Sequence, residues 1–273
     1  MNKVIIITGV SSGFGKATAE LLASHGHKVY GICRRKADHP NINYIQCDVR
    51  DVETISLKIK EIYDKEGAID VLINNAGMGI GGSLEMATRE EIDTQMNVNF
   101  MGCVNMCQKV LPYMRKQQYG KIINLSSIGG IMGLPYQGFY SASKFAIEGF
   151  SEALSAEVKG FGIHVSLVEP GDFATNFTAS RKNSQATMED PNYGPIFKRS
   201  LELIEKEEKK GLTPDTLARK IEKIVDANHP HLRYVVANFE QWLSVMLKRI
   251  IPGNWFVDIL SDYYKTKPDK NRP

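Results

Sequence analysis

The sequence predicts an α/β protein in which a doubly wound, parallel, seven-stranded sheet carries helices on both faces. Short β-branched runs such as KVIIIT, residues 3–8, lack polar alternation, which is typical of strands buried on both faces. Amphipathic helical patterns separate most of these runs. Glycine or a polar residue follows several of the expected strands, at Gly9, Arg34, Asp48, Asn75 and Ser127. Ligands of open α/β sheets bind outside the carboxyl ends of the strands, so a binding site is expected there.

Composition limits the classes of protein to consider. The 273 residues, 42% of them hydrophobic, suffice for the core of one domain spanning residues 1–273. The net charge of +3 comes from interspersed acidic and basic residues, which argues against a nucleic-acid partner. The four cysteines form no CxxC pair and no cluster with histidine, so we expect reduced core thiols and no metal site. No apolar run is long enough for a secretory signal or a membrane span, so we expect a cytoplasmic protein.

A glycine-rich turn joins the first strand to the first helix. It runs from Thr8 to Gly15 and leads into an amphipathic helix over residues 16–26, which a second strand at 27–33 follows. In such a βαβ unit the helix N-terminus points free N–H groups at the turn, where a pyrophosphate can bind. The alternative is that the glycines serve only the positive φ angles of the turn.

The end of the second strand indicates which dinucleotide would bind. A carboxylate at this point would bond the adenosine ribose 2′-hydroxyl, but the strand ends in Arg34, Arg35 and Lys36. Guanidinium groups can contact a 2′-phosphate bidentately, so the pattern favours NADP over NAD. The alternative is an ordinary solvated basic loop.

The middle of the chain continues the alternation of strands and helices. The expected elements are a strand at 43–48, a helix at 51–67, strands at 69–74 and 120–127, and helices at 88–117 and 139–158. Within the helical stretch 88–117, Asn97, Asn99 and Asn105 lower helix propensity and need hydrogen-bond partners if buried. We interpret Asn97 and Asn105 as structural.

The C-terminal third departs from this regularity. A sixth strand at 162–173, a helix at 213–227 and a seventh strand at 233–237 complete the pattern. Residues 176–212 are polar and turn-rich before a charged helix, which is typical of a lid over a substrate. Residues 239–273 carry many apolar side chains, which could complete the core, cover an apolar substrate or contact another subunit. Contact with a membrane ranks last because basic residues are few there.

One tyrosine and one lysine form the candidate reactive pair. Tyr140 and Lys144 lie four residues apart on the helix expected at 139–158, so they share one face of it. A phenol has a pKa of about 10, and a nearby ammonium group favours the phenolate, so a lowered tyrosine pKa is expected. Ser127 ends the preceding strand. The alternative is a chance Tyr-x-x-x-Lys on an amphipathic helix.

Several motifs in one order resemble the short-chain dehydrogenase/reductase family in its single-domain form, which has a Rossmann-type fold. They are Thr8-Gly9-x-x-x-Gly13-x-Gly15, Asn74-Asn75-Ala76-Gly77, Asn99, Ser127, Tyr140-x-x-x-Lys144 and Pro170-Gly171. The resemblance covers about residues 1–240. It implies that Tyr140 is the general acid/base and that Ser127 orients the substrate oxygen. It also implies that Lys144 holds the nicotinamide ribose, and that Asn99 anchors a water in a proton relay.

The resemblance also implies a set of contacts to NADP(H). Glycines and serines of the first turn would line the phosphates, Asp48 the adenine, Asn75 the adenosine side and Thr175 the carboxamide. In this family an arginine at the position of Arg34 accompanies NADP. The full expected set is Gly9, Ser11, Ser12, Gly13, Phe14, Gly15, Arg34, Arg35, Asp48, Val49, Asn75, Ala76, Gly77, Tyr140, Lys144, Pro170, Gly171 and Thr175.

The substrate is expected to be a small hydrophobic alcohol or ketone. The apolar residues expected to line its pocket are Met78, Ile80, Met132, Leu134, Pro135, Tyr136, Phe139 and Phe177, with ordinary core packing as the alternative. VEPGDFATNF and the apolar tail resemble the branch that includes 17β-hydroxysteroid and retinol dehydrogenases, which implies a steroid, a retinoid or a long-chain keto lipid. The alternative function is an NADP-binding sensor or scaffold without turnover. We expect a homodimer or homotetramer.

Overall fold

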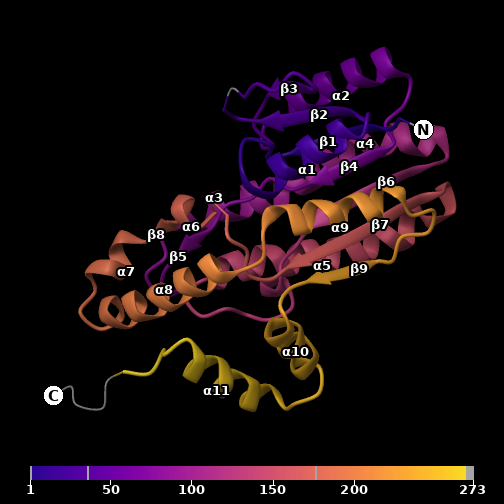
Figure 1. Cartoon of the computed structure of the whole chain (residues 1–273). Coiled ribbons are helices and arrows are strands. Elements are labelled where there is room, and N and C mark those ends of the chain that lie inside the picture. Colours follow the sequence, from indigo (N-terminus) through magenta and orange to yellow (C-terminus); the bar gives the residue numbers. More distant parts are fainter. Residues whose placement is uncertain (1, 36, 176, 269–273) are drawn as a thin grey trace.

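The computed structural model describes residues 2–35, 37–175 and 177–268. Lys36 of the basic strand end, Asn176 at the start of the expected lid and residues 269–273 of the tail lie outside the described residues. Seven parallel strands form one sheet in the order β3-β2-β1-β4-β6-β7-β9 (Figure 1). Their bounds are β1 Val4–Thr8, β2 Lys28–Cys33, β3 Ile42–Gln46, β4 Val71–Asn74, β6 Gly120–Leu125, β7 Ile163–Pro170 and β9 Arg233–Val236. The doubly wound parallel sheet is therefore confirmed.

Two hydrophobic clusters sandwich the sheet, because alternate residues of each buried strand point to opposite faces. Ile6 belongs to the cluster that contains the buried faces of α2 (Val52–Glu66), α4 (Gly102–Gln117) and α5 (Gly138–Val158). Its neighbours Ile5 and Ile7 belong to the cluster under α1 (Gly13–Ser24) and α9 (Pro214–Asp226). Continuous apolar runs, without polar alternation, are what such a two-sided core requires.

Two helices begin close to the expected residues, and capping side chains fix where they begin. Asp51 caps α2 by accepting a hydrogen bond from the Thr54 N–H, and Gly67 ends that helix in the left-handed region. Thr88 and Glu91 form a reciprocal capping box at the start of α3, Arg89–Met96. The stretch expected as one helix at 88–117 is instead interrupted by a π-helical turn, Asn97–Met101, between α3 and α4.

Residues 177–212, the described part of the expected lid, contain more regular structure than their composition suggests. Short helices α6 (Phe177–Ser180) and α7 (Gln185–Glu189) precede the long α8 (Tyr193–Lys210). Between the short helices, β8 (Lys182–Asn183) pairs in parallel with β5 (Ile80–Gly81), which ties the lid to the loop after β4. The lid is therefore anchored to the body by backbone hydrogen bonds.

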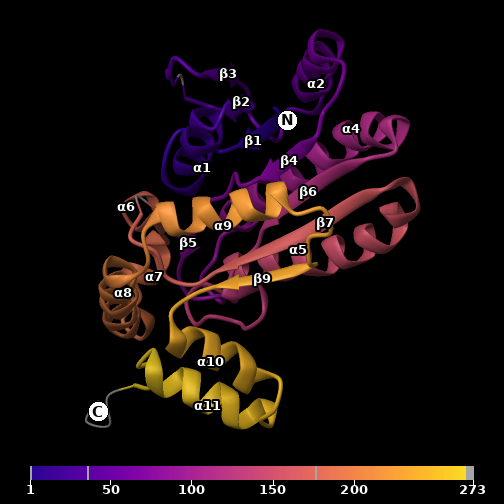
Figure 2. The same ribbon diagram turned by 45° about the vertical axis from the view of Figure 1, so that its right-hand side comes forward.

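The C-terminal helices α10 (Phe239–Lys248) and α11 (Gly253–Tyr263) form a pair set apart from the sheet (Figure 2). Their inner face packs Val245 and Phe256 against Ile128 and Met132, in a third hydrophobic cluster. Ile128 lies in η2, a short 3-10 helix (Ile128–Gly130), and a similar turn, η3 (Lys159–Phe161), follows α5. The tail thus extends the hydrophobic core, which was one of the roles expected for residues 239–273. The search for a helix able to span a membrane finds none within residues 2–35, 37–175 and 177–268.

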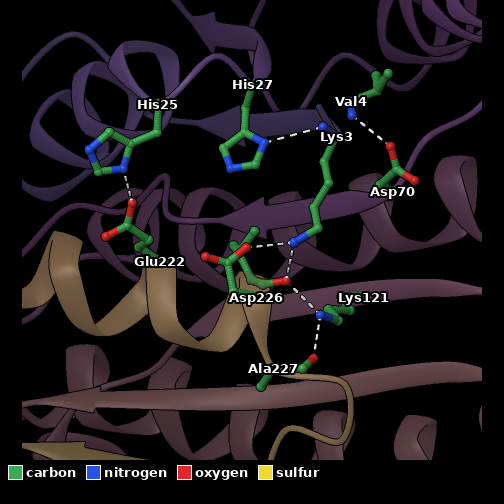
Figure 3. A network of polar contacts seen from close by, with 10 residues as sticks. Lys3, Val4, His25, His27, Asp70, Lys121, Glu222, Asp226 and Ala227 are labelled. Carbon is green, nitrogen blue, oxygen red and sulfur yellow. Dashed lines mark hydrogen bonds and ion pairs between the residues drawn. The ribbon is translucent and has the colours of Figure 1, made fainter. Parts of the chain in front are cut away.

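At the amino ends of the strands, two lysines hold the C-terminal end of α9 (Figure 3). The Lys3 ammonium donates to the Val225 carbonyl and pairs with Asp226 at 2.6 Å. Lys121 donates to the carbonyls of Val225 and Ala227. Cations at a helix C-terminus satisfy carbonyl groups that the helix leaves without partners. The two lysines thereby fix α9 at the amino ends of the strands, whereas the candidate site lies at their carboxyl ends.

Candidate active site

A cavity of about 540 Å³ opens at the carboxyl ends of the sheet strands. Of the residues expected at the active site, all except Gly15 and Asn99 line it. Those brought together are Gly9, Ser11, Ser12, Gly13, Phe14, Arg34, Arg35, Asp48, Val49, Asn75, Ala76, Gly77, Ser127, Tyr140, Lys144, Pro170, Gly171 and Thr175. Six different strand ends contribute, because the carboxyl ends of parallel strands meet along one edge of the sheet.

The glycine turn after β1 has the geometry of an anion cradle. Gly9 has φ +75°, and a Cβ there would lie 2.8 Å from the Ala76 Cα, so only glycine fits. Ser12 precedes α1 without capping it through its side chain, and the first turn of α1 has no acidic residue. The N-terminal N–H groups and the helix dipole therefore favour a phosphate at this end of the cavity.

Gly15 has a packing role behind this cradle. A Cβ at Gly15 would come within 2.4 Å of the Gly9 carbonyl oxygen, so its absence lets α1 approach the turn. The Asn75 amide nitrogen donates to the carbonyls of Thr8 and Gly9, and the Thr8 hydroxyl accepts from the Ala76 N–H. These bonds join the loop after β4 to the turn after β1, so both sides of the cradle are held together.

Basic side chains occupy the end of β2. Arg34 and Arg35 are exposed, and the Arg35 guanidinium donates to the Ser11 hydroxyl at 3.0 Å. The nearby Asp48 accepts a bidentate pair from Arg50, at 3.0 and 2.7 Å, which lowers the pKa of its carboxyl. Asp48 is thus an ionised acceptor on the cavity wall. Together with the uncapped α1 N-terminus, the two arginines fit the phosphate groups of a nicotinamide dinucleotide.

Lys144 lies buried beside the tyrosine ring. It is 5% exposed, its ammonium donates to the Leu125 carbonyl at 2.7 Å, and its Nζ is 5.8 Å from the centre of the Tyr140 ring. Burial lowers the pKa of Lys144 to about 8. The lysine is therefore held in one position by a backbone carbonyl while it still carries most of its charge at neutral pH.

Tyr140 lies on the cavity wall with Ser127 in hydrogen-bonding range. Burial raises the pKa of the Tyr140 phenol, and the hydrogen bond with the Ser127 side chain acts in the opposite direction. The lowered tyrosine pKa expected from the Tyr140 and Lys144 pairing is therefore wrong for this structure, because burial outweighs the Ser127 hydrogen bond. A raised pKa keeps the phenol protonated near neutrality, in the state that a proton donor needs.

Asn99 lies behind the cavity wall in the π-helical turn. Its side-chain amide donates to the Met78 carbonyl and to the Ser143 hydroxyl, both at 3.0 Å, and accepts from the Met78 N–H. Ser143 in turn donates to the Tyr140 carbonyl at 2.7 Å. The side chain therefore braces the first turn of α5, and the water relay at Asn99 stays a prediction. Asn105, expected to be structural, donates to the Val49 carbonyl.

The other end of the cavity is closed by the lid and the tail. Among the expected apolar wall residues, Met78, Leu134 and Phe177 line the cavity, whereas Met132 packs in the third hydrophobic cluster and Tyr136 packs on Phe197. Ile80 and Phe139 line a separate small pocket. Sequence reasoning missed several wall residues at this end, among them Asp172, Lys182, Leu203, Ile204, Glu207, Glu208, Tyr263 and Tyr264. The helical spacing of those in α8 was visible, but which side of α8 would face the cavity was not.

The four cysteines are buried and unpaired, as expected of core thiols. Within the described ranges, no group of three or more histidine, cysteine, aspartate or glutamate side chains could hold a metal ion.

Comparison with known proteins gives the site its context. The family model described as short chain dehydrogenase matches residues 3–186. The chain is 51% identical over 263 residues to the 3-ketodihydrosphingosine reductase of Bacteroides thetaiotaomicron, covering 96% of this chain and 98% of that protein. It is 34% identical to the NADPH-dependent 3-dehydrocapnine reductase of Ornithobacterium rhinotracheale, covering 85% and 87%. A solved short-chain dehydrogenase from Streptomyces avermitilis superimposes with a TM-score of 0.80 at 30% identity, covering 96% and 97% of the two chains.

Proposed function

The chain belongs to the short-chain dehydrogenase/reductase family and is an oxidoreductase, and from that premise we propose that it reduces a ketone of a long-chain lipid with NADPH. One observation carries the proposal. Tyr140, Ser127 and Lys144 line the same cavity as the glycine turn and Arg34, so a carbonyl and a dinucleotide can be held side by side. The physiological substrate would enter from the end formed by the lid and α11.

The mechanism assigns a separate task to each of three side chains. When bound, NADPH supplies a hydride from its nicotinamide C4 to the carbonyl carbon. Tyr140, protonated near neutrality, donates its proton to the carbonyl oxygen as negative charge develops there. The Ser127 hydroxyl orients that oxygen, and it is itself held by the Gly129 N–H at 3.0 Å. Lys144, fixed on the Leu125 carbonyl, provides positive charge behind the tyrosine.

Two features support a long-chain keto lipid over a steroid or retinoid. The cavity end away from the glycine turn is lined by Leu134, Phe177, Leu203, Ile204 and Tyr264, which can pack against an alkyl chain. The relative named for 3-ketodihydrosphingosine, a long-chain keto lipid, aligns over nearly the whole of both chains. A sequence that keeps half of its residues identical over such a length is expected to keep the general form of the cavity.

The substrate class can be tested by the rate of NADPH oxidation with a panel of ketones and an aldehyde. We expect 3-ketodihydrosphingosine to give a higher kcat/KM than a keto steroid or retinal at equal concentration. A preference for the rigid ring systems would contradict the lipid assignment. No oxidation of NADPH with any member of the panel would contradict the proposed function itself.

Cofactor choice gives a second prediction. Arg34→Asp is expected to raise the KM for NADPH by about 10- to 100-fold while changing that for NADH by less than about threefold, because only NADPH carries the 2′-phosphate. The control is Lys60→Asp, which makes the same charge change on exposed α2, away from the cavity. Steady-state kinetics with both cofactors measure the effect. Equal losses for NADPH and NADH would contradict a 2′-phosphate contact at Arg34.

A further inference from the structure

The end of the cavity formed by the lid and the tail is rich in carboxylates. Asp172, Glu207 and Glu208 line this end together with one cation, Lys182, whereas Arg34, Arg35 and Asp48 line the end next to the glycine turn. The end formed by the lid and the tail is otherwise largely apolar, so its carboxylates lie where a long-chain ketone would bind. Carboxylates in an apolar site are costly unless a cation accompanies them. Two of the three carboxylates have such a cation within the chain.

Glu208 and Glu207 have partners within the chain. Glu208 is buried and pairs with Arg181, and its second oxygen accepts from the Thr178 hydroxyl at 2.6 Å. Glu207 lies 3.5 Å from the ammonium of Lys210 on the same helix. These two acids therefore complete contacts within the lid, which leaves Asp172 to be explained.

Asp172 follows Pro170-Gly171 at the end of β7, and only one of its carboxylate oxygens has a partner. Gln241 of α10 donates to its Oδ2 at 2.5 Å and accepts from its backbone N–H at 3.1 Å. Within the described ranges Oδ1 has no hydrogen bond and the carboxylate has no ion pair of its own, and the one cation that lowers its pKa, Arg181, is paired with Glu208. Gln241 therefore fixes the orientation of the side chain without neutralising its charge.

The surroundings of Asp172 make this charge unfavourable as it stands. Burial, followed by the negative charge of Glu208, raises the pKa of the Asp172 carboxyl to about 6, so it is still ionised at neutral pH. Its charge acts on Tyr140 and Tyr264, whose phenol pKa values are also raised, first of all by their own burial. The carboxylate thus lines the same cavity as the reactive tyrosine and as Tyr264 of the tail.

We propose that Asp172 is a specificity-determining residue that binds a protonated amine adjacent to the ketone of the substrate. This inference rests on the proposed function and narrows its substrate class to long-chain amino ketones. Oδ1 would accept a charge-assisted hydrogen bond from the ammonium group, while Oδ2 keeps its bond to Gln241. With the ketone at Tyr140 and the amine at Asp172, the substrate is held at two points, which sets the face of the carbonyl that receives the hydride.

A free amine is then required. An N-acylated substrate has lost its positive charge and carries a bulkier group, so it cannot offset the charge of the half-buried Asp172 carboxylate. The enzyme would accordingly act on the amino ketone before any acylation of its nitrogen, and the reaction that supplies its substrate must leave the amine free.

The test compares 3-ketodihydrosphingosine, which carries the amine, with its N-acetyl derivative, in the full chain with NADPH. Asp172→Asn keeps the shape of the side chain and an oxygen for Gln241, but removes the charge. We expect it to lower kcat/KM for the free amine by about 10- to 100-fold, mainly through KM, and to leave or raise the activity with the N-acetyl compound. Glu202→Gln, an exposed acid on the outer face of α8, is the matched control and should change neither substrate.

The outcomes separate this inference from the proposed function. Wild-type protein that reduces both compounds equally well, with no selective loss in Asp172→Asn, would overturn the role of Asp172 and leave the keto-lipid reductase standing. Wild-type protein that reduces neither compound would overturn both. NADPH affinity, measured by fluorescence, should be the same in wild type and variant, and a loss of affinity would assign Asp172 to the fold or the cofactor site instead.

Discussion

Replacing Tyr140 with phenylalanine is expected to lower kcat for ketone reduction by about 10²- to 10⁴-fold, which is the usual contribution of a positioned proton donor. The phenol is the titratable donor next to Ser127 on the cavity wall. Phenylalanine keeps the ring, so its contact with Phe177, at 5.9 Å between ring centres, is retained. The measurement is single-turnover oxidation of bound NADPH after mixing with 3-ketodihydrosphingosine.

Binding of NADPH to this variant separates an enzyme from a sensor or scaffold. The dissociation constant should change by less than about threefold, because the glycine turn and Arg34 are distant from the phenol hydroxyl. Tyr44→Phe, which removes a phenol hydroxyl from β3 away from the cavity, is the control and should keep full activity. Undiminished reduction by the Tyr140 variant would show that another group supplies the proton.

Replacing Arg233 with methionine is expected to lower the free energy of unfolding by about 3–5 kcal/mol, the usual cost of leaving buried charges without their partner. Arg233 in β9 pairs with Glu148, Glu152 and Glu169, which come from α5 and β7. The side chain of Glu169 is fully buried and that of Glu148 is 8% exposed. Without the guanidinium these two carboxylates face each other in the protein interior. Urea unfolding followed by circular dichroism measures the loss.

The loss should depend on pH. Burial and the charge of Glu148 raise the pKa of Glu169 from 4.5 to about 7, so the folded protein holds this proton more tightly than the unfolded chain. The contribution of Glu169 is therefore fully present below pH 4.5 and is lost as the pH rises towards 7. In Arg233→Met the two acids lack their cation, so the deficit relative to wild type should widen from pH 5 to pH 8. Arg219→Met, which removes an exposed arginine, should be neutral, and a deficit independent of pH would argue against charge as the cause.

Sequence patterns correctly predicted those features that depend on residues close together in the chain. The confirmed sheet follows from apolar runs such as residues 3–8, because strands buried on both faces need no polar alternation. The glycine turn could be placed because a strand and a helix flank it directly. Tyr140 and Lys144 could be paired because one helical turn separates them. The membership of the family, expected from these motifs, is likewise confirmed.

Sequence patterns did not predict features that depend on burial, such as the pKa of a side chain. The sequence pairing predicts a lowered pKa for Tyr140, but the pKa is raised, since burial depends on residues that are distant in the sequence, such as Phe177 against the tyrosine ring. The π-helical turn at Asn97–Met101 was likewise hidden, because a run of asparagines indicates only a weak helix. Asn99 in this turn donates to Ser143 of α5 and exchanges hydrogen bonds with Met78, so it links α5 to the loop after β4.

By itself, then, the amino-acid sequence determined the seven strands of the sheet, the glycine turn after β1 and the pair formed by Tyr140 and Lys144. Only the tertiary structure decided that Asp172 lines the same cavity as that tyrosine with one oxygen held by Gln241, and that Arg233 faces three glutamates from other elements. Periodicity and turn chemistry act over a few residues, whereas the partner and the burial of a charge are set by elements that meet only after packing.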